Sequence, residues 1–182
     1  MKVIFLDRDG VINQYPGHKQ YVVSAQGMRL LPGVCKAIAR LTKAGFKIFI
    51  ISNQAGVGKG IYSREELSRI TDKLLKGIEK AGGKITATHY CTHRPEENCR
   101  CRKPKAGMIE IVRKKYRFNA EKAFFIGDSI RDVQTAHAAG LQSILVLSGR
   151  EKLSNRNNWQ DIPDFIFPNL ISAVSLILQA KR

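Results

Sequence analysis

Two carboxylates stand two residues apart near the start of the chain. Asp7 and Asp9 belong to the run Asp-Arg-Asp-Gly and directly follow residues 3–6, an apolar run that predicts a short buried strand. In an extended segment, the side chains of residues i and i+2 point the same way. Two carboxylates this close repel each other unless a cation lies between them, and a hard divalent ion such as Mg²⁺ suits oxygen ligands. Asp128, which follows another apolar run, is the candidate for a third oxygen ligand.

Strands alternate with helices along the chain. This order predicts an α/β fold, a doubly wound parallel sheet in a single domain that covers residues 1–182. Ligands of such sheets bind beyond the carboxyl ends of the strands, so we expect Asp7, Ser52 and Asp128 to lie near one another. The expected strands are residues 3–6, 47–51, 85–90, 123–126 and 143–147, and the expected helices are residues 32–43, 63–81, 105–116, 130–139 and 168–180.

Four sequence elements resemble, in their order, the motifs of the haloacid dehalogenase superfamily. They are Asp7-x-Asp9-Gly10, Ser52 after the second strand, Lys103, and Gly127-Asp128-x₃-Asp132. The resemblance implies a Rossmann-like fold with a minimal cap. It also implies phosphatase activity rather than dehalogenation, because the second acidic position is Asp.

The resemblance implies that Asp7 attacks phosphorus and forms an aspartyl-phosphate. Asp9 is then expected to protonate the leaving oxygen and to deprotonate the water that hydrolyses the intermediate. The catalytic Mg²⁺ would be bound by an Asp7 oxygen, the backbone carbonyl of Asp9 and an Asp128 oxygen.

The same resemblance gives the phosphoryl oxygens three partners. Ser52 and Lys103 would hold these oxygens, where negative charge must be stabilised, and Arg102 would join Lys103 there. Asp132 has two readings that the residues leave open. It either supports this cluster, or it is a surface helix residue or a simple partner of Lys103.

Four soft metal ligands lie within eleven residues, in the segment 91–101. Cys91, His93, Cys99 and Cys101 supply three thiolates and one imidazole, which complete a tetrahedral zinc site with no position left for water. We therefore expect a structural Zn²⁺ that pins this loop and holds Lys103, two residues further on, in place. Cys35 lies on an apolar helix face and is expected to be a core residue.

The thiol segment narrows the resemblance. With Asp-x-Asp-Gly-x-Ile-Asn and Ser-Asn-Gln, it is similar to D-glycero-D-manno-heptose 1,7-bisphosphate phosphatases and the related histidinol-phosphate phosphatases. The implied substrate is a small phosphorylated sugar that loses its 7-phosphate, with histidinol phosphate as the alternative. The residues that the resemblance assigns to substrate contact are Asn13, Tyr15, His18, Ser52, Asn53, Gln54, Arg102, Lys103 and Ser129. His18 also has a plain interpretation as an exposed loop histidine.

Two further functions remain as alternatives because the net charge is +16. One is a phosphatase of nucleic-acid ends, and the other is a zinc-dependent nucleic-acid-binding module without catalysis. The sequence has a single tryptophan, Trp159, and no aromatic row for stacking a single strand, which weighs against the first. The acidic residues at the strand ends weigh against the second.

The basic residues concentrate between Arg100 and Arg117, where eight Lys or Arg accompany one acidic residue, Glu110. This run is either a solvated basic face or a positive rim around a phosphate site. The glycine-rich run 56–60 lacks the first glycine and the hydroxyl residue of a phosphate loop, so we interpret it as a flexible loop near the site.

The apolar segments of the sequence give expectations for the cellular compartment and for the oligomeric state. The apolar run at the N-terminus is too short for a signal peptide, and no apolar stretch reaches the ~18 residues of a membrane span. We expect a cytoplasmic monomer without a membrane or specific nucleic-acid partner. In a reducing compartment, clustered thiols indicate a metal before a disulfide.

Overall fold

Residues 1–179, which the computed structural model describes, form six strands, five α-helices and three short 3₁₀ helices. The strands are β1 Lys2–Leu6, β2 Phe46–Asn53, β3 Ala87–Cys91, β4 Phe124–Gly127, β5 Gln142–Val146 and β6 Phe165–Phe167. The helices are α1 Val34–Lys43, α2 Arg64–Lys80, α3 Gly107–Lys115, α4 Ile130–Ala138 and α5 Leu170–Gln179.

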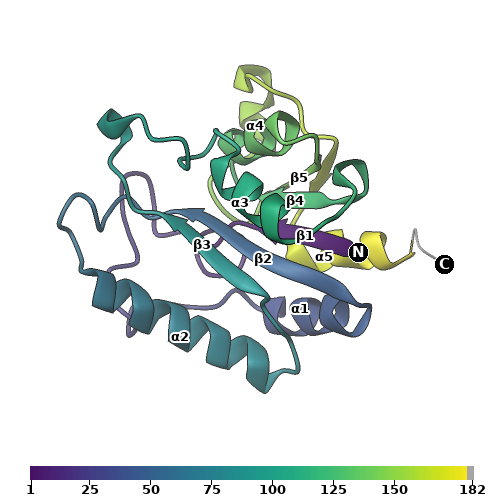
Figure 1. Cartoon of the computed structure of the whole chain (residues 1–182), viewed down its shortest axis with the longest axis horizontal. Coiled ribbons are helices and arrows are strands. Elements are labelled where there is room, and N and C mark those ends of the chain that lie inside the picture. Colours follow the sequence, from purple (N-terminus) through teal and green to yellow (C-terminus); the bar gives the residue numbers. More distant parts are fainter. Residues whose placement is uncertain (180–182) are drawn as a thin grey trace.

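All neighbouring strands pair in parallel, in the order β3-β2-β1-β4-β5-β6 (Figure 1). The chain therefore winds outward from β1 in one direction and then in the other, which confirms the doubly wound sheet. Parallel strands need crossover connections, and the helices supply them. Among the described residues, no helix has both the length and the apolar character that crossing a bilayer requires.

The sheet is buried between two helical layers. Helices α1, α2 and α5 cover one face, and α3 and α4 cover the other (Figure 1). Alternate side chains of a strand point to opposite faces, so Ile4 and Leu6 of β1 pack in the first core while Val3 and Phe5 pack in the second. This double burial is the reason that β1 is apolar along its whole length.

Helix α1 shows how the sequence makes one of these layers. Its buried residues are Val34, Ala37, Ile38 and Leu41, at the i, i+3, i+4 and i+7 positions of one helical face. Cys35 lies beside this stripe and is partly buried against the same core.

Two local features differ from the sequence expectations. Strand β6 was not expected, because its three residues are too short a run for an alternation pattern. Ser63 and Glu66 have the spacing of a capping box, but only half of it forms, with the Ser63 side chain accepting a hydrogen bond from the backbone N–H of Glu66. The Glu66 carboxylate instead accepts from the backbone N–H of Ala25 at 2.8 Å.

Replacing Ile38 by Ala tests the packing of α1. Ile38 is fully buried, so the variant should lose about 2–5 kcal/mol of unfolding free energy through lost contacts and the cavity left behind. Ile111 on α3 is 53% exposed, and Ile111→Ala should change stability by less than about 0.5 kcal/mol. Urea denaturation measures both, and equal losses would contradict this assignment of the buried face.

Candidate active site

A cavity of about 380 Å³ opens beyond the carboxyl ends of β1, β2 and β4. Asp7 directly follows β1, Ser52 and Asn53 end β2, and Asp128 follows β4. The loop before α3 brings in Lys103 from the side. The residues predicted from the sequence that line this cavity are Asp7, Asp9, Tyr15, His18, Ser52, Asn53, Arg102, Lys103, Asp128 and Ser129.

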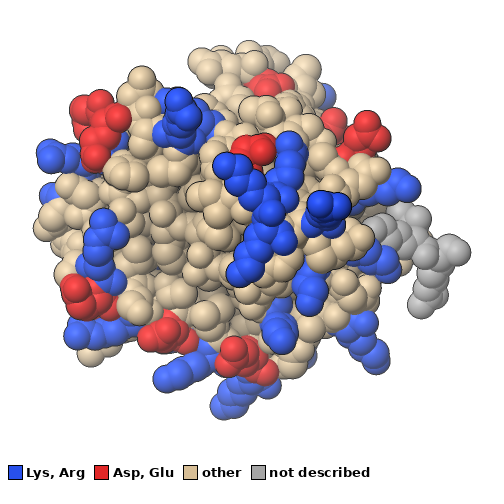
Figure 2. All heavy atoms as spheres, viewed as in Figure 1, with Lys and Arg blue, Asp and Glu red and all other residues tan. Residues whose placement is uncertain are grey.

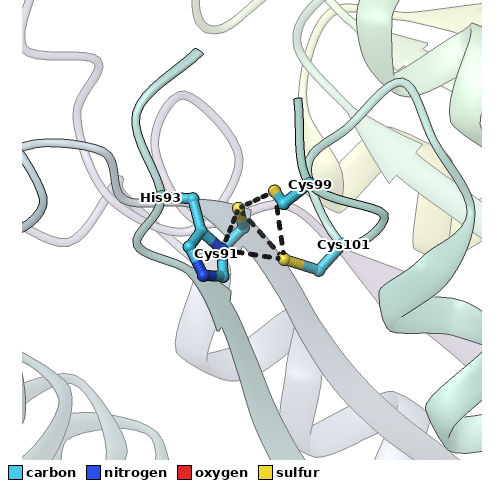
Figure 3. Close-up of side chains that lie close together, drawn as sticks. All are labelled: Cys91, His93, Cys99 and Cys101. Carbon is cyan, nitrogen blue, oxygen red and sulfur yellow. Dashed lines mark hydrogen bonds between the residues drawn. The ribbon is translucent and has the colours of Figure 1, made fainter. Parts of the chain in front are cut away.

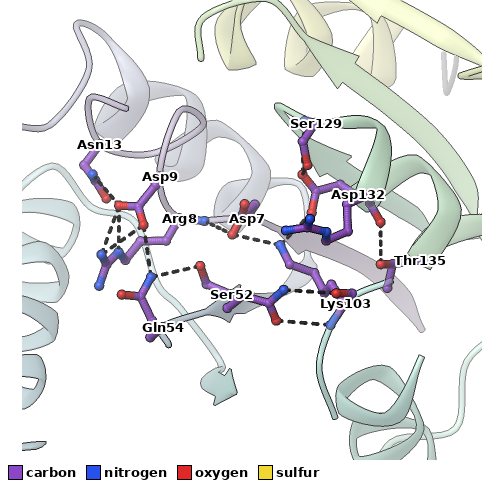
Figure 4. A network of polar contacts seen from close by, with 12 residues as sticks. Asp7, Arg8, Asp9, Asn13, Ser52, Gln54, Lys103, Ser129, Asp132 and Thr135 are labelled. Carbon is purple, nitrogen blue, oxygen red and sulfur yellow. Dashed lines mark hydrogen bonds and ion pairs between the residues drawn. The ribbon is translucent and has the colours of Figure 1, made fainter. Parts of the chain in front are cut away.

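The ammonium of Lys103 is buried between two carboxylates (Figure 4). Its Nζ lies 3.0 Å from Oδ1 of Asp7 and 2.6 Å from Oδ1 of Asp132. Burial opposes the charge, but the Asp132 and Asp7 carboxylates hold the pKa of Lys103 above its ordinary value. Asp132 also accepts hydrogen bonds from the backbone N–H and the hydroxyl of Ser129, the N-cap of α4. Asp132 is buried, so it is not a surface helix residue, and its contact with Lys103 agrees both with a role as a Lys103 partner and with support of the cluster.

Three carboxylates crowd around this single ammonium. Oxygens of Asp7, Asp128 and Asp132 all lie within 4.8 Å of one another. Burial raises the pKa of Asp7 to about 6 in spite of the neighbouring Lys103. Burial, followed by the Asp132 and Asp7 charges, raises the pKa of Asp128 well above its usual range. The cluster thus has an excess of negative charge that one further cation can neutralise.

The backbone of two glycines, Gly10 and Gly149, packs closely against the carboxylate of Asp128. A Cβ on Gly10 would lie 2.1 Å from Oδ2 of Asp128, and a Cβ on Gly149 would lie 2.0 Å from it. The backbone N–H of Arg150 donates to the same oxygen at 2.8 Å. An all-oxygen donor set that is held this tightly, and whose negative charge Lys103 balances only in part, fits a small hard cation such as Mg²⁺.

The carboxylate of Asp9 faces away from Lys103 and is held by three side chains (Figure 4). Arg8 donates from Nε at 3.1 Å and from Nη2 at 3.0 Å, Asn13 donates from Nδ2 at 2.8 Å, and Gln54 donates from Nε2 at 3.0 Å. Arg8 itself is fully buried, with its guanidinium over the ring of Tyr90. So many donors fix both the position and the orientation of Asp9.

The end of β2 fixes the backbone that carries Lys103. The side chain of Asn53 donates to the carbonyl oxygen of Lys103 and accepts from its backbone N–H, both at 3.1 Å. Ser52, which is buried, interacts with Asp7 and opposes the rise in the pKa of Asp7. β2 therefore positions the nucleophile candidate and the ammonium together.

The four predicted zinc ligands lie together at the end of β3 (Figure 3). Sγ of Cys91 is 3.5 Å from Sγ of Cys99 and 3.3 Å from Sγ of Cys101, and Nδ1 of His93 is 3.2 Å from Sγ of Cys101. These separations exclude disulfides, whose sulfurs are ~2.05 Å apart. Four ligands ~2.3 Å from a tetrahedral zinc would be about 3.8 Å from one another. The donor set and its spacing fit Zn²⁺.

The thiol segment is tied to the cavity on both sides. It is followed by Arg102 and Lys103, and the carbonyls of Cys91 and Thr92 accept hydrogen bonds from the backbone of Gln54 and Gly58 at 2.7 and 3.1 Å. A metal that closes this loop would therefore limit the motion of Lys103 and of the segment after β2 at once.

Sequence reasoning missed most of the positive rim of the cavity. Arg131, Arg150 and Lys59 line it together with Arg102. Burial, and then the neighbouring Arg102 and Arg150, lower the pKa of Arg131. The sequence signal for Arg150 is weaker, since this residue lies in the loop after β5 rather than directly at the end of the strand. Lys and Arg are also the more abundant charged residues on the face in Figure 2.

Two residues assigned to substrate contact do not belong to the cavity wall. Asn13 and Gln54 lie behind Asp9 and are fully buried or nearly so, with exposed fractions of 0% and 1%. Their contact with substrate stays a prediction, whereas their contact with Asp9 is direct.

Known proteins are similar to this chain in sequence and in fold. A family model described as HAD-hydrolase-like matches residues 100–173. The curated D-glycero-beta-D-manno-heptose-1,7-bisphosphate 7-phosphatase of Neisseria meningitidis serogroup A is 35% identical over 98% of this chain and 96% of its own length. The protein of the same name from Pseudomonas aeruginosa is 33% identical over 97% and 98%.

Among solved structures, the D,D-heptose 1,7-bisphosphate phosphatase from Bordetella bronchiseptica, complexed with magnesium and phosphate, superposes with a TM-score of 0.91. It is 34% identical, and the match covers 99% of each chain. The sequence resemblance is therefore confirmed over the full length. The chain belongs to the D-glycero-beta-D-manno-heptose-1,7-bisphosphate 7-phosphatase family of haloacid dehalogenase-like hydrolases.

Proposed function

We propose that this protein is a Mg²⁺-dependent phosphatase that removes the 7-phosphate of D-glycero-β-D-manno-heptose 1,7-bisphosphate. The observation that carries this proposal is that one cavity joins a buried carboxylate cluster with Lys103 to a rim of arginines. The carboxylate cluster with Lys103 can cleave one phosphate ester, and the rim of arginines can bind the other phosphate of the substrate. The curated relatives act, by their names, on such a bisphosphate.

In the mechanism that this geometry supports, Asp7 attacks phosphorus and the ester oxygen leaves. Lys103, 3.0 Å from Asp7, and the buried Ser52 stabilise the charge on the phosphoryl oxygens. Asp9 donates a proton to the leaving oxygen and then removes one from the water that hydrolyses the aspartyl-phosphate. Bound by Asp7, Asp128 and the Asp9 carbonyl, Mg²⁺ would supply the positive charge that the carboxylate cluster lacks.

The rim favours a bisphosphate over histidinol phosphate. The basic residues of the rim are Lys19, Lys59, Arg102, Arg131 and Arg150. The acidic residues that line the cavity are those of the proposed catalytic site, Asp7, Asp9, Asp128 and Asp132. A second phosphate is attracted by this rim, whereas the ammonium group of histidinol phosphate is repelled. Histidinol phosphate therefore remains the second candidate only on the strength of the shared motifs.

The thiol cluster has a structural role in this proposal. Four protein ligands leave no site for a reactive water, so a bound Zn²⁺ would act through the loop that carries Arg102 and Lys103. Thiolate ligands persist in a reducing compartment, which supports an assignment to the cytoplasm.

Asp7→Asn should abolish turnover of the heptose bisphosphate with Mg²⁺ present, a loss on the order of 10³-fold or more, because an amide cannot form the phosphoenzyme. Released phosphate is the measurement. Asp72→Asn, on the exposed surface of α2, serves as the control and should keep full activity. Substantial activity of the Asp7 variant would contradict covalent catalysis.

Metal analysis of protein purified without chelators should find about one zinc per chain. Cys99→Ser should lose this zinc and lower turnover, because the loop before Lys103 is no longer closed. Cys35→Ser removes a thiol outside the cluster and should keep both the metal and the activity. A zinc-free protein with full activity would refute the structural role of the cluster.

A substrate panel tests the assigned ester. Turnover should be fastest with the β anomer of the heptose bisphosphate, slower with the α anomer and slowest with histidinol phosphate and a 3′-phosphorylated DNA oligonucleotide. The ratio kcat/KM for each substrate is the readout. Preference for DNA would mean that the basic rim serves a polymer and would overturn the assignment.

A further inference from the structure

One buried amide connects the two aspartates of the proposed mechanism. Nε2 of Gln54 donates to Oδ2 of Asp9 at 3.0 Å and to Oγ of Ser52 at 3.1 Å (Figure 4). Ser52 in turn interacts with Asp7 and opposes the rise in its pKa. The amide nitrogen therefore contacts the proton donor directly and the nucleophile through Ser52. The position of one side chain that does not touch the cavity affects the nucleophile and the proton donor together.

The orientation of this amide is set from behind by Tyr62. Its hydroxyl donates to Oε1 of Gln54 at 2.6 Å, in a buried contact. An ionised Asp9 can only accept hydrogen bonds, so the nitrogen of the amide must face Asp9 and the oxygen must face Tyr62. Burial raises the pKa of Tyr62 to about 12, which keeps the donated proton in place.

The surroundings hold Tyr62 firmly. The side chain is only 7% exposed. A Cβ on Gly56 would lie 2.2 Å from the Tyr62 ring, so the glycine is what allows the ring to lie against the backbone here. The backbone N–H of Gln54 donates to the carbonyl of Cys91 at 2.7 Å, which fixes the other end of the arrangement.

We propose that Tyr62 and Gln54 act as a pair of positioning residues, in which the Tyr62 hydroxyl fixes the Gln54 amide so that it orients Asp9 and Ser52 for proton and phosphoryl transfer. This role rests on the proposed phosphatase function. Without the hydroxyl, the amide can rotate by half a turn and present its oxygen to Asp9. Two acceptors then face each other, and Asp9 leaves the position that proton transfer requires.

The variant Tyr62→Phe removes the hydroxyl and keeps the ring. With the heptose bisphosphate, its kcat should fall about tenfold, a part of the ~10²- to 10⁴-fold that a positioned acid–base group contributes. KM should stay within about threefold, because neither Tyr62 nor Gln54 lines the cavity. Tyr116→Phe is the matched control, since Tyr116 packs against Phe49 on the other side of the sheet and should keep its activity.

A double-mutant cycle separates positioning from a general loss of structure. Gln54→Met should lower kcat at least as much as Tyr62→Phe, and the double variant should be no slower than Gln54→Met alone, since Tyr62 acts through Gln54. Losses that multiply, an unchanged kcat in Tyr62→Phe, or a rise in KM alone would each overturn the proposal. Gln54→Glu places a second carboxylate beside Asp9 and gives an independent loss of kcat if Tyr62→Phe does not fold.

The same assay shows whether the proposed phosphatase function itself is wrong. In that case Asp7→Asn retains turnover, or the wild-type protein releases no phosphate from the heptose bisphosphate. Failure of the positioning role leaves the wild type active and Asp7→Asn inactive, with Tyr62→Phe equal to the wild type.

Discussion

The structure depends most on the burial of three carboxylates around one ammonium. Asp7, Asp128 and Asp132 share the space beside Lys103, and a single positive charge does not balance them. A buried carboxylate is costly unless it is paired, so this cluster is stable in the ionised form only with another cation. Burial, together with the neighbouring carboxylates, raises the pKa of Asp7, and the excess of negative charge suits the cluster to a metal ion. The negative charge around Asp7 and the positive charge of the rim therefore lie in the same cavity, where the first would bind a metal ion and the second a phosphate group.

Three segments must meet for this cluster to form. The parallel sheet brings Asp7 and Asp128 to one edge, because β1 and β4 are neighbours in register and end there. Lys103 comes from outside the sheet, on a loop that Asn53 holds by two hydrogen bonds and that the thiol cluster closes. The zinc ion proposed for this position would have a structural purpose, since a long polar loop has no core of its own to fix it.

The sequence predicted the sheet and the strand-end residues because both follow from short-range patterns. Apolar runs mark the buried strands, and polar residues directly after Leu6, Ile51 and Gly127 mark the site. The boundaries were accurate to within a few residues, whereas β6 is too short for any pattern. The matches to the family extend over almost the full chain and agree with the predicted fold.

What the sequence did not predict depends on side-chain direction. Gln54 was assigned to the substrate, but its amide turns inward to Asp9 and Ser52, and no spacing rule distinguishes the two directions. Arg8 was passed over because a charged residue is normally exposed, yet it is fully buried against Asp9 and Tyr90. Tyr62 and Arg131 become significant only when distant segments are brought together.

Acid quenching of the wild-type enzyme during turnover, followed by mass spectrometry of its peptides, tests whether Asp7 is the covalent nucleophile. We expect a phosphoryl group on the N-terminal peptide, attached to Asp7, that disappears when the substrate is exhausted. Turnover without a phosphorylated peptide, or a phosphoryl group on another residue, would contradict this role of Asp7.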